Sequence, residues 1–192
     1  MVKTWLDEAR KRQPIPVPPP LPARFLKATV ASIENEHCQG IADEYLTAFW
    51  DVAPVGIAPV LIGPAQQWKS FTAAAICRVL HHHAKVQTDW VNCPVDLVLL
   101  DRYSTNGRSK LRTWIDVPFL VMDDFAAVDP RGQVLETLVA IASARFDAMH
   151  PTLWTGNIDG NGDEVREVLG RTFGPAFTRR LESGGGAFRL LV

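Results

Sequence analysis

The chain has 192 residues, of which 47% are hydrophobic and 21% are charged, a composition typical of one globular domain and not of a disordered or fibrous protein. Its formal net charge of −1 excludes a globally basic nucleic-acid-binding protein, so any DNA contact has to come from a local basic patch. The apolar stretches are far shorter than the roughly 20 residues that span a bilayer, and the N-terminus does not have the pattern of a signal peptide. We therefore expect a cytoplasmic protein without a membrane partner.

The N-terminal region differs in composition from the rest of the chain. Residues 1–12 include an amphipathic stretch, and residues 14–22 are a proline-rich run that cannot hold a helix, because proline lacks a backbone donor and restricts the residue before it. We predict two regions: a short helix and proline-rich strap over residues 1–22, and a domain over residues 23–192. The strap either presents its helix to a partner or packs along the domain.

From residue 23 onward, short β-rich runs alternate with helical periodicity, which predicts an α/β domain with a five-stranded, mostly parallel sheet. The predicted strands are residues 59–63, 85–91, 117–122, 151–155 and 187–192. The predicted helices are residues 39–52, 70–83, 94–103, 133–149, 164–169 and 176–181. Glycines predict turns at Asn106-Gly107 and at residues 184–186.

A phosphate-binding pattern follows the first predicted strand. Gly63, Lys69 and Ser70 have the spacing of GxxxxGK[ST]. In that pattern, backbone N–H groups at a helix N-terminus hold phosphate oxygens, the lysine reaches the β and γ phosphates, and the serine hydroxyl binds Mg²⁺. Trp68 replaces the second glycine, at a position whose backbone conformation is closed to most side chains. The pattern therefore predicts a nucleotide site at these four residues, altered by an indole ring.

Two further strand ends carry polar residues. The apolar run 117–122 leads into Asp123 and Asp124, which have the order of a Walker B pair. Asp123 is predicted to bind Mg²⁺, directly or through water, and Asp124 to polarise the attacking water. Asn157 follows the next predicted strand, where its amide can contact the γ-phosphate and the water. The alternatives are a strand that ends in solvated acids and a simple turn at Asn157.

In their joint order and spacing, these motifs resemble the AAA+ ATPases, and among them the DnaC-like replicative helicase loaders, which include the IstB-type transposition ATPases. The resemblance covers about residues 25–192 and implies a three-layer P-loop NTPase fold, the AAA+ RecA-like core. It implies Walker A ligands Lys69 and Ser70, the Walker B pair Asp123 and Asp124, and the sensor-1 residue Asn157. Arg180 is similar to the arginine finger of the family, which reaches the nucleotide of a neighbouring subunit; the alternative is an ordinary surface arginine.

The sequence departs from this family at several positions. Loop 64–68 lacks both internal glycines, and Asp124 stands where glutamate is expected. A side chain one methylene shorter holds the attacking water less closely, which slows chemistry that depends on positioning. The chain stops soon after the last predicted strand, so we expect neither a sensor-2 arginine nor a separate lid domain. The ATPase activity is accordingly expected to be weak or altered, or absent.

A local basic cluster surrounds the predicted turn at Asn106-Gly107. It consists of Arg102, Arg108, Lys110 and Arg112. Loaders and initiators of this class place DNA-facing elements here, so the cluster is predicted to contact the backbone of single-stranded DNA; the alternative is a solvated face.

We therefore expect a helicase-loader-like AAA+ protein of a phage or mobile element, which binds ATP or ADP with Mg²⁺ through a degenerate Walker A loop. The expected partners are the replicative helicase, single-stranded DNA, and a second copy of the chain reached through Arg180. Two alternatives remain open. One is a catalytically inactive pseudo-ATPase that serves as a protein-binding module in replication, with Trp68 filling its loop, and the other is an IstB-type transposition ATPase.

Overall fold

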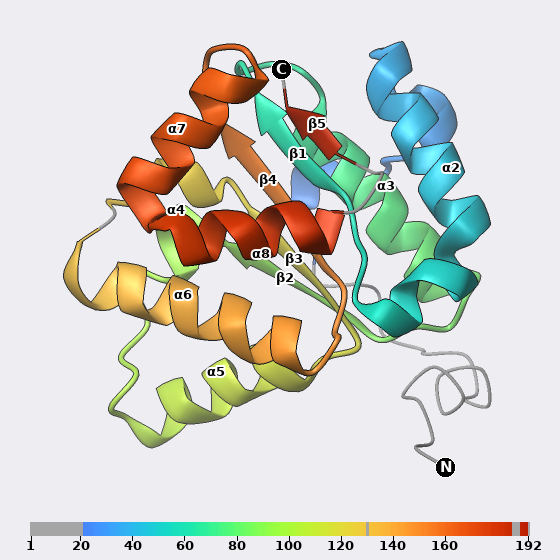
Figure 1. The fold of residues 1–192 in the computed structure, drawn as a ribbon. Coiled ribbons are helices and arrows are strands. Elements are labelled where there is room, and N and C mark those ends of the chain that lie inside the picture. The colour runs from blue at the N-terminus through green and yellow to red at the C-terminus, as the bar shows by residue number, and fades with distance from the viewer. Residues whose placement is uncertain (1–20, 130, 186–188, 192) are drawn as a thin grey trace.

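The computed structural model describes residues 21–129, 131–185 and 189–191 of the chain. A central sheet lies between two layers of helices (Figure 1). The helix predicted within residues 1–12 and most of the proline-rich strap lie outside the described residues, so the division at residue 22 stays a prediction. In the part of the chain that the structure describes, no helix is both long and apolar enough to cross a membrane.

The sheet contains five strands, and every pairing between neighbouring strands is parallel. The strands are β1 (Val60–Gly63), β2 (Thr88–Asn92), β3 (Phe119–Asp123), β4 (Thr152–Asn157) and β5 (Arg189–Leu191). Their order across the sheet is β2-β3-β4-β1-β5, so β4 lies between β1 and β3. Parallel strands all end at the same side of the sheet, which we call the carboxyl edge, and all start at the opposite side, the amino edge.

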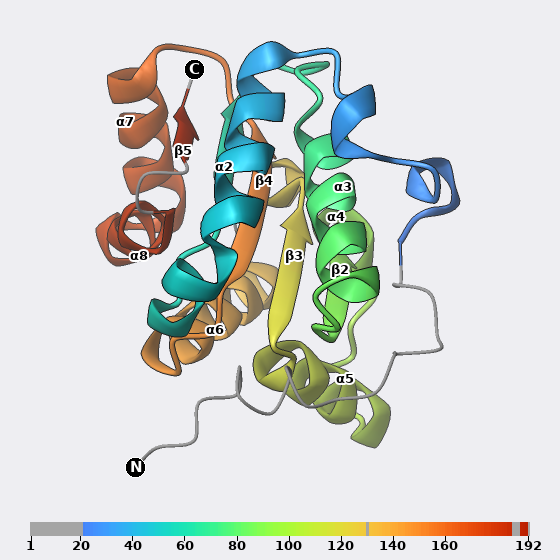
Figure 2. The ribbon, with the colours of Figure 1, turned by 90° about the vertical axis from the view of Figure 1, so that its right-hand side faces the viewer.

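Helices cover both faces of the sheet. Helices α2 and α3 lie on one face, α6, α7 and α8 lie on the other, and α5 packs against α6 (Figure 1, Figure 2). The longer helices are α2 (Glu36–Val52), α3 (Lys69–His82), α5 (Thr105–Asp116), α6 (Gly132–Asp147), α7 (Gly162–Phe173) and α8 (Pro175–Gly185). The shorter helical turns are η1 (Ala23–Phe25), η2 (Val30–Ser32), η3 (Ala53–Val55), α4 (Cys93–Asp96) and η4 (Phe125–Ala127).

Strand β3 explains why two helical layers are needed. Successive side chains of a strand point to opposite faces of the sheet. Phe119 and Val121 belong to the core beneath α2 and α3, whereas Leu120 and Met122 belong to the core beneath the helices of the other face. Because the strand is apolar on both faces, each face has to be covered, and the three-layer α/β class expected from the sequence is confirmed.

The segment between β2 and β3 differs from the prediction. The helix predicted over residues 94–103 is a single turn, α4. The reason lies at Asp101, whose carboxylate accepts a hydrogen bond from the backbone N–H of Tyr103 (3.1 Å) and whose carbonyl accepts one from the Ser104 hydroxyl (2.8 Å). These local bonds form a turn in place of continued helical bonds.

The turn predicted at Asn106-Gly107 is also wrong, because both residues lie in the first turn of α5. The Ser104 hydroxyl caps this helix by accepting a hydrogen bond from the Gly107 N–H (2.9 Å). A Cβ atom on Gly107 would lie 1.8 Å from the Asp101 carbonyl oxygen, so close approach of two backbone segments, and not a turn, requires glycine there. The turn predicted at residues 184–186 begins too early, since α8 continues to Gly185, and Gly186 lies outside the described residues.

Candidate functional site

Three of the predicted site residues end neighbouring strands at the carboxyl edge. Gly63 is the last residue of β1, Asp123 of β3 and Asn157 of β4. Gly63 is in register with Asn157, and β4 separates β1 from β3. Asn157 therefore lies between the strand of the phosphate-binding pattern and the strand of the two acids, which is the arrangement that the motif order predicted.

The loop between β1 and α3 keeps a backbone shape that favours glycine although it contains none. Trp68 has φ 62° and ψ 7°, and Gln66 has φ 65°, both in the left-handed region. A side chain in this region costs about 1–2 kcal/mol per residue. Trp68 is the N-cap residue of α3 and makes no side-chain capping bond, so its side chain does not occupy the first N–H groups of this helix.

Lys69 is buried at the start of α3, with 5% of its surface exposed. Its Nζ atom donates a hydrogen bond to the carbonyl oxygen of Pro64 in the loop. Burial lowers the pKa of Lys69, while Cys38, Asp124 and Asp159 act in the opposite direction. Lys69 and Asp124 are therefore close enough to affect each other electrostatically.

Helix α2 supports the loop from the side. The Asn35 amide donates to Gln67 Oε1 (2.9 Å), and the Cys38 thiol donates to the Gln67 carbonyl (3.2 Å). Asn35 also caps α2 by accepting a bond from the Cys38 N–H (3.0 Å). The N-terminus of α2 therefore holds Gln67 in place next to Trp68.

The two acids and Thr155 form a hydrogen-bonded group at the carboxyl edge. Asp123 is 2% exposed, and its Oδ1 accepts a hydrogen bond from the Thr155 hydroxyl (2.6 Å). The same hydroxyl accepts a bond from the Asp124 N–H (2.9 Å), and the Asn157 amide donates to Asp124 Oδ1 (2.9 Å). Thr155 thus fixes both acids, although the sequence pattern marked it only as the last residue of a predicted strand.

Asp124 is held in an unusual electrostatic environment. Its backbone is left-handed, with φ 55°. Burial and the neighbouring Asp123 raise the pKa of Asp124, while Asn157, Lys69 and Arg24 act against that rise. The Asp124 carboxylate is therefore within electrostatic reach of two cations, Lys69 and Arg24, as a group at a phosphate site would be.

A cavity of about 440 Å³ borders the loop and the start of α3. Its lining residues are Arg24, Phe25, Gln66, Gln67, Trp68, Lys69, Ser70, Phe71 and Asn157. Trp68 is half-buried and forms part of the wall, so the indole does not fill the space over Lys69. The motifs did not predict Arg24 and Phe25 as site residues, because both come from η1, far before the loop in the chain.

Arg180 does not join this group. It lines a small cavity together with Thr152, the first residue of β4, whereas Asn157 at the other end of β4 lines the Lys69 cavity. The ends of a six-residue strand are about 16 Å apart. Among the described residues, the buried Nε of Arg180 has no hydrogen-bond partner, and its Nη1 donates to the Ala176 carbonyl at 3.4 Å.

The basic cluster is largely engaged with acids of the same chain. Arg102 pairs with Glu136 (2.6 Å), Lys110 with Asp96 (3.1 Å) and Arg112 with Asp116 (3.4 Å). Arg108 is exposed on α5. The four cations therefore lie on one surface segment, but three of them carry a neighbouring carboxylate that weakens the local positive potential.

The fold is similar to solved structures of replication proteins. One is the DnaC helicase loader, with a TM-score of 0.75 and 15% identity over 88% of this chain and 99% of that chain. Another is DnaI, with a TM-score of 0.68 and 18% identity over 90% of this chain and 95% of that one. A third is the replication initiator DnaA bound to AMPPCP and single-stranded DNA, with a TM-score of 0.63 and 11% identity over 82% of this chain and 48% of that one.

A scan against protein-family models found no match, and a search of curated protein sequences found none either. At these identities the likeness concerns the fold. The chain has the fold of the AAA+ domain of DnaC-like helicase loaders, and the fold implied by the sequence motifs is confirmed.

Proposed function

We propose that this chain is a helicase-loader-like AAA+ protein that binds ATP or ADP with Mg²⁺ in the Lys69 cavity. The main support is one open cavity bordered by a buried lysine, the N-terminus of α3 and Asn157, whose amide donates a hydrogen bond to Asp124 of the acid pair. The volume of about 440 Å³ is in the ordinary range for small-molecule sites. The residues of this cavity therefore fit a nucleotide.

Each residue has a role that follows from its position. The first N–H groups of α3 and the ammonium of Lys69 would hold phosphate oxygens, with Lys69 leaving the Pro64 carbonyl for a stronger, charge-assisted partner. Ser70 and Asp123 would hold Mg²⁺, and a bound Mg²⁺ supplies positive charge to the phosphates. Gly63 ends the strand that delivers the loop to this edge.

Hydrolysis is expected to be slow. Asp124 is the candidate base for the attacking water, but its short side chain is held by the amide of Asn157 (2.9 Å). Burial and Asp123 raise its pKa, so Asp124 is a better proton acceptor than an exposed aspartate. Chemistry would proceed when Asn157 releases this carboxylate toward the water.

Arg180 could serve this site only from a second copy of the chain. In its own chain it lines a cavity at the amino edge, on the other side of the sheet from Lys69. Among the described residues its Nε has no hydrogen-bond partner, so this guanidinium has an unused donor that a rearrangement on assembly could satisfy. Self-association through Arg180 would therefore couple assembly to hydrolysis.

The expected macromolecular partner is a replicative helicase, because the DnaC and DnaI folds cover most of this chain. Single-stranded DNA is a second expected partner, with Arg108 as its leading contact, since Arg102, Lys110 and Arg112 are ion-paired. The cytoplasmic location remains a prediction from the sequence.

Calorimetric titration with a non-hydrolysable ATP analogue and Mg²⁺ tests the nucleotide site. We expect the Lys69→Ala variant to bind the analogue about tenfold or more weakly, because a charge-assisted phosphate contact is lost. The matched control is Lys85→Ala, since the Lys85 Nζ also donates to a backbone carbonyl, that of His82, at the other end of α3 (2.6 Å). Absence of binding at millimolar analogue, or equal binding by both variants, would contradict the proposed site.

The pseudo-ATPase is the second candidate, and two observations favour it. Lys69 is bonded to the loop itself, and Trp68 occupies the glycine position of the pattern. This function predicts co-elution with the replicative helicase in gel filtration that neither nucleotide nor Lys69→Ala alters. Helicase binding that depends on nucleotide would exclude it.

A further inference from the structure

The side chains that line the Lys69 cavity fall into two chemical classes. The polar half of the lining includes Lys69, Ser70 and Asn157. The aromatic half consists of Phe25, Trp68 and Phe71, together with the cation Arg24. A lining with both classes of side chain suits a ligand that carries both phosphates and a flat ring.

The aromatic half is an ordered wall. Phe71 stands edge-to-face against Trp68, with ring centroids 5.0 Å apart and an interplanar angle of 82°. It stands edge-to-face against Phe25 as well, at 6.4 Å and 84°. The guanidinium of Arg24 lies 4.6 Å from the centroid of Phe25. Aromatic rings and arginine are the groups on which nucleic bases stack.

Trp68 is part of this wall in a strained backbone conformation. Its left-handed backbone would be free of strain with glycine, whereas an indole there costs about 1–2 kcal/mol. Strained residues of this kind cluster at ligand sites, where the strain is part of the function. Because the cavity is still about 440 Å³, the indole lines the site and leaves room for a ligand.

We propose that Trp68 is a binding residue for the base of the nucleotide, and that the wall of Phe25, Trp68 and Phe71 selects nucleoside triphosphates over inorganic polyphosphate. This inference rests on the proposed nucleotide binding at Lys69. It gives the replacement of the loop glycine a role in recognition, in place of the steric block that the sequence pattern alone suggests.

The test compares two ligands, ATP analogue and inorganic tripolyphosphate, each titrated with Mg²⁺. The readout is the ratio of their dissociation constants, which removes any general effect on the phosphate half. The wild-type chain is expected to prefer the analogue, and Trp68→Gly to lose about tenfold of that preference, as base-stacking residues do. Trp68→Phe keeps an aromatic ring and is expected to retain most of the preference.

Trp50→Ala is the matched control. Trp50 is also half-buried and stands edge-to-face against its neighbour Phe49, with centroids 5.1 Å apart, but it does not line the cavity. Its loss should leave the ratio unchanged. If Trp68→Gly leaves the preference for the analogue unchanged or increases it, the base-binding role is overturned while the nucleotide site stands. If the wild-type chain binds neither ligand, both proposals fail.

Discussion

A cation is buried at each edge of the sheet, but the two cations differ in the hydrogen bonds that they make. At the amino edge, Arg145 is 0% exposed and donates five hydrogen bonds of 2.7–3.0 Å, to Thr152 Oγ1 and to four backbone carbonyls. At the carboxyl edge, Lys69 is 5% exposed and donates to one loop carbonyl, that of Pro64. Burial lowers the pKa of Arg145 to about 9, so it stays charged at neutral pH. A buried cation held by several hydrogen bonds stabilises the fold, whereas one with a single bond to the described residues is available to a ligand.

The largest loss of stability is expected when Arg145 is replaced. Its guanidinium joins the end of α5 to the start of β4, through the carbonyls of Trp114, Ile115, Val117 and Pro151. Arg145→Met keeps the apolar stem but removes one buried donor from each of these carbonyls; those of Ile115 and Pro151 keep a second donor, His150 Nδ1 and the Leu120 N–H. We expect a loss of about 3 kcal/mol or more in the free energy of unfolding, measured by urea denaturation.

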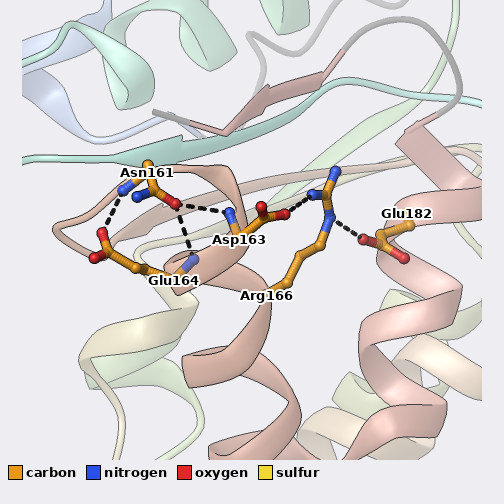
Figure 3. Close-up of polar contacts among 5 residues, drawn as sticks. All are labelled: Asn161, Asp163, Glu164, Arg166 and Glu182. Atoms are coloured by element: carbon orange, nitrogen blue, oxygen red, sulfur yellow. Dashed lines mark hydrogen bonds and ion pairs between the residues drawn. The ribbon is translucent and has the colours of Figure 1, made fainter.

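Arg166→Met is the control for that variant. Arg166 forms two ion pairs on the surface, one within α7 with Asp163 (2.8 Å) and one with Glu182 of α8 (2.7 Å), as Figure 3 shows. Because its side chain is 45% exposed, its loss should cost far less stability than the loss of Arg145. Similar losses for the two variants would mean that Arg145 is no more than another paired surface arginine.

Thr155→Val examines the carboxyl edge in the same way. The methyl group replaces a hydroxyl that donates to Asp123 and accepts from the Asp124 N–H. We expect a loss of about 1–2 kcal/mol in the free energy of unfolding, because two buried groups lose their partner, together with weaker binding of Mg²⁺ and nucleotide. The control is Thr137→Val. To the described residues, the Thr137 hydroxyl donates one bond, to the Gln133 carbonyl within α6 (2.7 Å), so its removal should be nearly neutral for stability. Unchanged Mg²⁺ binding by the Thr155 variant would contradict the role given to Asp123.

The smallest expected effect is a pH dependence of the free energy of unfolding, which comes from His150 at the amino edge. Its ring donates from Nδ1 to the Ile115 carbonyl (3.1 Å), which Arg145 also contacts, and burial lowers the pKa of His150. The unfolded chain therefore binds this proton at a higher pH than the folded chain. Stability from this group is complete above about pH 6.5 and is lost as the pH falls through the lower folded pKa.

Because His150 is only half-buried, the effect is discounted for solvent screening to about 0.5 kcal/mol. Urea denaturation at pH 7.5 and pH 5 should show a smaller acid loss for His150→Gln than for the wild-type chain. An identical acid loss in both would show that His150 titrates alike in the folded and unfolded states.

The sequence predicted those residues of the candidate site that lie at strand ends. Gly63, Asp123 and Asn157 follow apolar runs, and parallel strands bring such ends to one edge. The same reasoning was less useful for the basic cluster. Side chains at the surface pair with any acid within reach, as Arg102 in the turn before α5 does with Glu136, which lies on α6. The helix expected over residues 94–103 was wrong because the local bonds of Asp101 replaced helical ones.

By itself, the sequence determined the alternation of strands and helices, the α/β class and the motif residues of the carboxyl edge, because these depend on periodicity and on the order of short segments. The three-layer fold was implied by the resemblance that these motifs carry. Only the tertiary structure decided which distant residues complete the site. It brought Arg24 and Phe25 to the Lys69 cavity and placed Arg180 at the opposite edge. It also determined that Trp68 lines the Lys69 cavity and does not fill it, since the direction of a side chain depends on the backbone angle of its loop and on the packing around it.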